Sequence, residues 1–173
     1  SGFYDSTLTI ELSCSYAGAI YYTTDGKKPT IEKGFLYSSP ILIDSTTVLR
    51  ATLIRKGYFA GTIVTQSYFI NENPSIPVVS LTADPKDLWD KKQGIYYKYK
   101  RKGWERQGNV EYFDLSDSGA LFPAFNNAIK MRISGKTSRR QPKKSFALFT
   151  DDAYGNSRIN YQIFKDKDIH SFG

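Results

Sequence analysis

The sequence has too few cysteine and histidine residues for several common kinds of site. Its 173 residues include one Cys, Cys14, and one His, His170. A disulfide within the chain needs two cysteines, and a structural zinc site needs several Cys or His ligands, so both are excluded. We predict that Cys14 is a small buried hydrophobic residue. A Ser-His-Asp or Cys-His catalytic device would have to use His170, near the end of the sequence, to which we assign no role.

Long hydrophobic runs are also missing. No stretch of about 18 apolar residues exists, which predicts that nothing spans a membrane, and no signal-peptide pattern is present. The sequence starts at Ser1 without Met and ends at Gly173 without turn or capping residues, so we expect a segment of a longer protein. The aromatic content is high, with 2 Trp, 13 Tyr and 11 Phe. Such a chain buries enough apolar area to offset its ordering entropy, which argues against disorder.

The charge is unevenly distributed. Residues 1–72 contain six basic and six acidic side chains, so the formal net charge of +7 comes entirely from residues 73–173. The join at residues 71–77 is polar and contains Pro74 and Pro77, which cannot sit inside a sheet ladder. We therefore predict two units, residues 1–72 and residues 76–173, with a connector so short that the units touch.

The first unit has the pattern of a small β-sandwich. Leu8, Ile10 and Leu12 alternate with polar residues, as expected for a strand with one buried face. Asp25-Gly26 is a strong turn signal. The pattern predicts about five to seven short strands, carried by residues 6–13, 19–24, 36–43, 48–54 and 62–70.

Three segments of this unit carry a family resemblance. The run IYYTTDGKKPT at residues 20–30, the run YSSPI at residues 37–41, and Leu49-Arg50-Ala51 occur in order. They resemble the immunoglobulin-like module named after the C-terminal domain of chitobiase and β-hexosaminidase. The resemblance implies a non-catalytic accessory unit of secreted or surface enzymes and adhesins. Locally, the motif is a strand, a tight turn and Pro29 at the exit; contact of Asp25 or the tyrosines with a ligand is the alternative.

The second unit is predicted to be β-rich (α+β) with one short helix. Strands are expected over residues 76–81, 94–99, 109–115, 128–134 and 145–150. Asp84 is the expected N-cap of a helical turn or two over residues 83–90, with Pro85 at the first helical position. Because the last strand is apolar on both faces, we expect it to be central and covered on both sides.

Ordered segments of the second unit carry another resemblance. They include PVVSL at 77–81, LWD at 88–90, GIY at 94–96, VEYFD at 110–114 and SRRQPKKSF at 138–146. They resemble the N-terminal part of the bacterial CotH-like family, relatives of a spore-coat kinase. One departure is Ser134, where the family pattern has an arginine before the glycine.

The CotH-like resemblance implies a secreted or cell-surface parent protein with an atypical kinase-like domain that uses ATP and Mg²⁺. Its acidic residues for metal binding and phosphoryl transfer follow the region seen here, so we expect residues 76–173 to need the remainder of the CotH-like domain and to be catalytically silent alone. We assign no catalytic residue, metal ligand or cofactor to this segment. Asp151, Asp152, Asp166 and Asp168 are interpreted as solvated turn residues.

A basic stretch is the candidate phosphate site. No Asp or Glu occurs between Gly119 and Thr150. Small residues at 134–138 would offer backbone N–H groups to an anion, and Arg and Lys would add charge. The spacing is not that of a Walker loop. The candidate nucleotide- or phosphate-binding residues are Lys136, Arg139, Arg140, Lys143 and Lys144; a solvated basic hairpin is the alternative.

Carbohydrate binding or adhesion is the other functional hypothesis. Tyr22, Tyr58 and Trp104 are candidate stacking platforms for a glycan, although aromatic residues in strands also form cores. Residues 98–106 mix cations with aromatics, but no nucleic-acid fold signature accompanies them and Glu105 interrupts them, so we expect an exposed hairpin or loop with Trp104 packed at its base. The two resemblances imply a protein or glycan partner at the cell surface, and from the residues we expect no nucleic acid.

Overall fold

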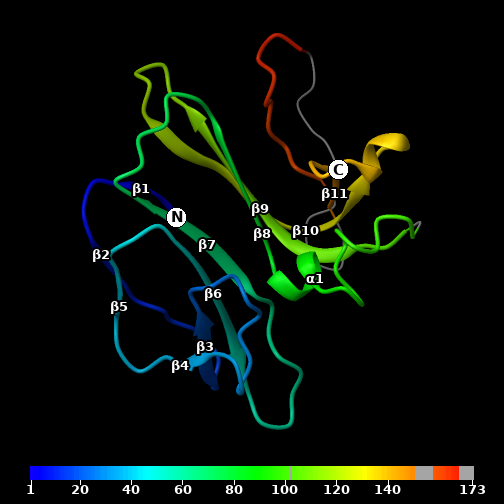
Figure 1. The fold of residues 1–173 in the computed structure, drawn as a ribbon. Helices are drawn as coiled ribbons and strands as arrows, with labels where there is room; N and C mark the ends of the chain where they lie inside the picture. Colours follow the sequence, from blue (N-terminus) through cyan, green and yellow to red (C-terminus); the bar gives the residue numbers. More distant parts are fainter. Residues whose placement is uncertain (102, 151–157, 168–173) are drawn as a thin grey trace.

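The computed structural model describes residues 1–101, 103–150 and 158–167, which form three β-sheets (Figure 1). The strands of a five-stranded and a two-stranded sheet lie within residues 2–70, and those of a four-stranded sheet within residues 78–149. The mainly β fold class with one short α-helix is confirmed. No helix in these described ranges is long and apolar enough to cross a membrane.

The first unit is a sandwich of seven strands, in the expected range. The five-stranded sheet has the order β1-β7-β6-β3-β4, with β1 parallel to β7, and the two-stranded sheet pairs β2 with β5. Leu8, Ile10 and Leu12 pack on the buried core, as their alternation predicts; its buried members are Ile41, Ile43, Leu49, Tyr68 and Ile70. The strands are β1 (Gly2–Tyr4), β2 (Leu8–Ile10), β3 (Ala19–Thr23), β4 (Phe35–Leu36), β5 (Ile41–Ile43), β6 (Thr47–Ile54) and β7 (Val64–Ile70).

Residues 36–43 contain a strand, β5, as predicted; the chain leaves the larger sheet after β4 and enters the smaller one at β5, with Pro40 between them. One prediction for the first unit was wrong. Cys14 is exposed rather than buried. The reason is that β2 ends at Ile10, so Cys14 lies beyond the paired part of the strand. The short strand β1 was not predicted.

The second unit is a four-stranded antiparallel sheet of order β11-β10-β9-β8. Its core contains Ala83, Ile95, Val110, Ile129, Met131, Ile133 and Ile159. Asp84 caps helix α1 as predicted, since its Oδ1 accepts from the backbone N–H of Lys86 at 2.9 Å. The elements are β8 (Val78–Ala83), α1 (Pro85–Trp89), β9 (Arg106–Leu115), β10 (Leu121–Ser134), the 3₁₀ turn η1 (Thr137–Arg140) and β11 (Ser145–Phe149).

The predicted strand over residues 94–99 is wrong. This segment forms turns against α1, with Gly94 N–H donating to Asp90 O at 2.7 Å and Ile95 N–H donating to Asp87 O at 2.9 Å. A Cβ at Gly94 would lie 2.6 Å from the backbone nitrogen of Asp90, so only glycine fits there. The apolar residues that resembled a strand instead include Ile95, which is buried in the core.

The strand predicted to be central, β11, lies at the edge of its sheet. Leu148 is 39% exposed there, so the strand is not covered on both faces. The strand that is covered on both faces is β9. Val110 and Tyr112 point to one face and Glu111 and Phe113 to the other, and all four are buried. Both faces are covered because the first unit packs on one of them.

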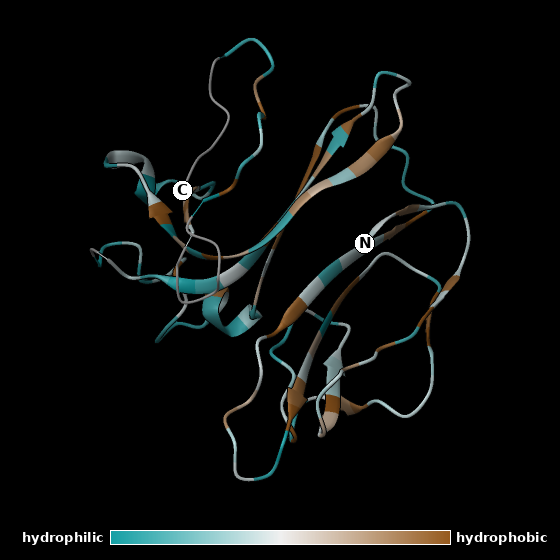
Figure 2. Cartoon of the chain, turned by 180° about the vertical axis from the view of Figure 1, so that it is seen from behind, coloured by the Kyte–Doolittle hydropathy of each residue, from teal (hydrophilic) through white to brown (hydrophobic). Residues whose placement is uncertain are grey.

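The two units meet through aromatic rings. Phe113 of β9 lies edge-on to Phe3 of β1 and Phe69 of β7, with centroids 5.3 and 5.6 Å apart, and Phe3 stacks on Phe69 at 4.5 Å. Figure 2 shows the corresponding strands of the two units facing each other. The units therefore share an apolar interface in addition to the connector.

Candidate functional site

The candidate phosphate residues lie on the loop between β10 and β11. Gly135 adopts φ +101°, and η1 follows directly. L side chains rarely adopt this φ, so the turn favours glycine; an added Cβ would also meet Ser138 Oγ, a hydroxyl that can rotate away. The loop is thus a tight structure that presents its cations from a short 3₁₀ turn and the residues after it.

Two of the five candidates fix this loop to the rest of the unit. Lys144 Nζ donates to Arg139 O at 2.5 Å and to Gln141 O at 3.0 Å, and it lies 4.2 Å from the ring centroid of Tyr99. Arg139 Nη1 donates to Tyr99 O at 3.3 Å. These cations hold the loop against residues 94–99, which gives them a structural role.

The other three candidates show no such contacts with the described residues. Lys136, Arg140 and Lys143 are exposed, and within the described ranges none of them forms an ion pair. The structure therefore brings all five candidates onto one loop, but divides them into two that support the loop and three that face solvent.

The three candidate stacking residues do not share one surface. Tyr22 packs on the core of the first unit, 5.7 Å from Phe35 and 6.4 Å from Tyr37. Trp104 packs on the core of the second unit and donates from Nε1 to Gln93 O at 2.9 Å. Tyr58 alone is largely exposed, at 66%, with the guanidinium of Arg55 over its ring at 4.4 Å.

Within the described residues, the acidic side chains form no candidate metal site. No group of three or more His, Cys, Asp or Glu side chains gathers within residues 1–101, 103–150 and 158–167. Asp166 is exposed and pairs with its neighbour Lys167 at 3.5 Å, as expected of a solvated turn residue. Asp151, Asp152, Asp168 and His170 lie outside the described residues.

A polar network at the interface was not predicted. Glu111 of β9 is 1% exposed; its carboxylate accepts from Ser67 Oγ of β7 at 2.5 Å and from Asn126 Nδ2 of β10 at 3.2 Å. Asn126 Nδ2 also donates to Thr65 O at 2.8 Å. The available signal was an acid between the apolar residues Val110 and Tyr112, but its partners come from segments distant in sequence.

A second interface cluster surrounds the helix α1. Asp84 Oδ2 accepts from the backbone N–H of Lys28 at 2.9 Å. Asp87 pairs with Lys28 Nζ and with Arg106 Nε, both at 3.3 Å. Buried Arg50 donates to Gly26 O at 2.8 Å; burial lowers the pKa of its guanidinium, and the nearby Asp84 and Asp87 carboxylates oppose that shift. The Asp25-Gly26 turn of the first unit is therefore held against the start of α1.

The comparison with protein families agrees with the sandwich geometry of the first unit. Residues 1–65 match the family model of the Chitobiase/beta-hexosaminidase C-terminal domain. We therefore call the unit formed by β1 to β7 the chitobiase-type module. No curated protein and no solved structure matches the chain. The match ends inside β7, and the resemblance of residues 76–173 to CotH-like proteins stays a prediction.

Proposed function

We propose that the chitobiase-type module is a non-catalytic, carbohydrate-associated accessory unit that holds the following β-rich unit in a fixed orientation. The parent would be a secreted or cell-surface protein, and residues 76–173 the N-terminal part of its CotH-like domain. The observation that carries this proposal is the buried contact between Ser67 and Glu111 across the interface. A module attached only by a flexible linker would not need a shared buried network.

The interface has the composition expected of a fixed contact. It combines an apolar centre, formed by the rings of Phe3, Phe69 and Phe113, with hydrogen bonds to a buried carboxylate. Buried polar groups that lose their partners are costly, so separation of the units would expose both apolar and charged surface. The two units should therefore move together.

The test is the tumbling of the two units in solution. We expect ¹⁵N relaxation of the whole chain to give one rotational correlation time for both units. Ser67→Asp places a second carboxylate beside Glu111 and should give two different correlation times. Phe59→Ala, which removes a fully exposed ring, is the matched control. Independent tumbling in the unmodified chain would contradict the proposal.

For the parent protein we propose an atypical kinase-like activity with ATP and Mg²⁺. The exposed cations Lys136, Arg140 and Lys143 on an acid-free loop support contact with a phosphate group. In full-length protein, Lys136→Ala and Lys143→Ala should each weaken ATP binding about three- to tenfold, as expected on losing a charge-assisted contact. Lys91→Ala, another exposed lysine, is the control; equal affinities in all variants would remove the phosphate role.

Glycan binding is the second candidate, favoured by one observation. Tyr58 and Phe59 are largely exposed on the loop between β6 and β7, and Phe59 is 102% exposed. Exposed rings on a loop are suitable for stacking on sugars. A glycan array with the whole chain and with Tyr58→Ala would test this; no bound glycan, or binding unchanged by Tyr58→Ala, would argue against it.

A further inference from the structure

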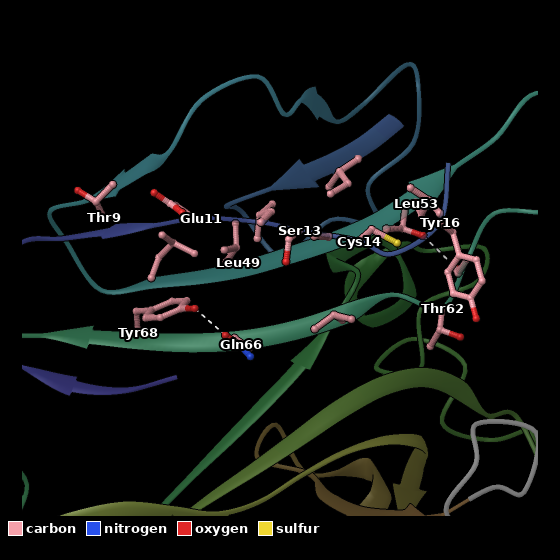
Figure 3. A pocket seen from close by; sticks show the side chains of 17 residues that line it. Thr9, Glu11, Ser13, Cys14, Tyr16, Leu49, Leu53, Thr62, Gln66 and Tyr68 are labelled. Atoms are coloured by element: carbon pink, nitrogen blue, oxygen red, sulfur yellow. Dashed lines mark hydrogen bonds between the residues drawn. The ribbon is translucent and has the colours of Figure 1, made fainter. Parts of the chain in front are cut away.

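A groove of about 700 Å³ opens between the two sheets of the chitobiase-type module (Figure 3). One wall is the inner face of the larger sheet, where Leu49 and Leu53 of β6 and Gln66 and Tyr68 of β7 line it. The other wall is the segment of residues 9–14, and Tyr16 lies at one end. The lining is more apolar than polar, and the volume of the groove falls in the range of about 300–1,000 Å³ that ligand pockets occupy.

The groove runs along the edge of an extended backbone. Successive side chains of an extended chain point to opposite sides, yet all six residues from Thr9 to Cys14 line the groove. Strand β2 pairs with β5 over Leu8–Ile10 only. In the described part of the chain, the backbone groups of residues 11–14 make no hydrogen bond to protein. Their N–H and C=O groups are available to another strand.

The smaller sheet is too narrow to cover the larger one. It has two strands against five, and Val64 of β7 lies in the groove with 59% of its surface exposed. A further strand beside residues 9–14 would cover this aliphatic surface. A single aliphatic molecule would bury the same side chains but would leave the backbone edge unpaired.

We propose that the groove binds an extended peptide segment of a partner protein, which adds a strand beside residues 9–14. Strand addition obtains affinity from main-chain hydrogen bonds and specificity from alternate side chains. Alternate aliphatic side chains of the peptide would contact Leu53 and Val64. Glu11 is the one charged residue of the lining and has no ion pair within the described ranges, so the peptide carries a Lys or Arg opposite it.

The probe is a displayed library of short random peptides, selected on the whole 173-residue chain. We expect the selected peptides to alternate aliphatic and polar residues and to include Lys or Arg. The tightest peptide is then synthesised and its affinity measured by fluorescence anisotropy. Failure to select any peptide, or selection of sequences without this alternation, would overturn the proposal.

Two substitutions locate the binding. Val64→Lys should weaken the peptide at least about tenfold, as expected for a central contact. Leu42→Lys is the matched control, since Leu42 is 64% exposed on β5 and does not line the groove. Glu11→Lys should weaken the basic peptide, and replacing the peptide's cation with Glu should restore binding.

Folding of each variant is checked by circular dichroism and thermal melting. A peptide whose affinity is the same for Val64→Lys and the unmodified chain would show that the groove is not its site. Analytical ultracentrifugation tests whether a second copy of the chain occupies the groove instead. A dimer that Val64→Lys dissociates would assign the groove to that second copy and overturn the proposal.

Discussion

Ser67 of the chitobiase-type module donates a hydrogen bond of 2.5 Å to Glu111 of the following unit, and both residues are 1% exposed. Ser67 Oγ also lies 2.7 Å from Ser80 Oγ of β8. One hydroxyl group thus connects strand β7 to two strands of the other unit. A buried carboxylate requires such donors, because its desolvation is compensated only by hydrogen bonds or charges.

The first prediction concerns this contact. Ser67→Ala should lower the free energy of unfolding by about 2 kcal/mol, because a charge-assisted hydrogen bond is lost and the carboxylate stays buried. Chemical denaturation of the whole chain measures the change. Ser39→Ala, at an exposed serine, is the control and should change stability by less than about 0.5 kcal/mol.

A double-mutant cycle with Glu111→Gln isolates the pair. We expect a coupling energy of more than about 0.5 kcal/mol between positions 67 and 111, as for residues in one network. Additive effects of the two substitutions would show that the contact contributes nothing specific to the interface.

In the cluster at α1, we predict that Asp87 contributes more to stability than Lys28 does. Asp87→Ala should cost about 3 kcal/mol, because it removes the acid between Lys28 and Arg106 at a site where Asp87 is 9% exposed. Lys28→Ala should cost less than about 1 kcal/mol, since the Lys28 side chain is 37% exposed. Urea denaturation compares the two variants, and equal costs would contradict this assignment.

Gly94 is predicted to be intolerant of any side chain. Gly94→Ala would place its Cβ 2.6 Å from both Asp90 N and Leu88 O, which are backbone atoms, so we expect a loss of more than about 2 kcal/mol. Gly103→Ala is the control: φ is +65°, but no atom of the described residues outside its chain neighbours lies within 4 Å of an added Cβ. It should cost only the conformational penalty of about 1 kcal/mol. Thermal melting of both variants tests the difference.

We predict that the protein loses stability at alkaline pH because of two tyrosines, Tyr68 and Tyr161. Burial raises the pKa of Tyr68 to about 12; burial and then the hydrogen bond to Asp114 raise the pKa of Tyr161 to about 12. Such a phenol keeps its proton in the folded state after the unfolded chain has lost it. Its contribution to stability is therefore complete below pH 10, the ordinary pKa, and falls as the pH rises from 10 to 12.

Ultraviolet titration of tyrosinate measures this effect. Tyr68→Phe and Tyr161→Phe should each remove one late-ionising phenol, and the melting temperature of each should fall less steeply over that pH range. Asp114→Asn should lower the pKa of Tyr161 only in part, since burial is the larger cause. A full return to the ordinary value would show that the hydrogen bond dominates.

Much of the local structure follows from sequence patterns. Alternation located β2, β6, β7 and β9 to within a few residues, and the Asp84-Pro85 pair located the start of α1. These features depend on side-chain periodicity and capping within a few neighbouring residues, which a sequence displays directly. The prediction failed over residues 94–99, because the same apolar residues also suit turns packed on a helix.

The roles of the candidate site residues could be predicted less well than the strands, because these roles depend on tertiary contacts. The sequence located five cations on one loop, but only the tertiary contacts show that Lys144 and Arg139 fix the loop while Lys136, Arg140 and Lys143 face solvent. Similarly, the sequence left open whether Tyr22 and Trp104 stack on a glycan or pack in a core, and the structure packs their rings on two separate cores.

By itself, the sequence determined that the chain is mainly β, that its excess positive charge lies after residue 72, and that no intrachain disulfide forms. Composition and local periodicity are sufficient for these properties. Tertiary structure alone decided that Ser67 meets Glu111, that β9 rather than β11 is covered on both faces, and that residues 11–14 border an open groove. Each is a relation between segments far apart in the chain, and only packing brings such segments together.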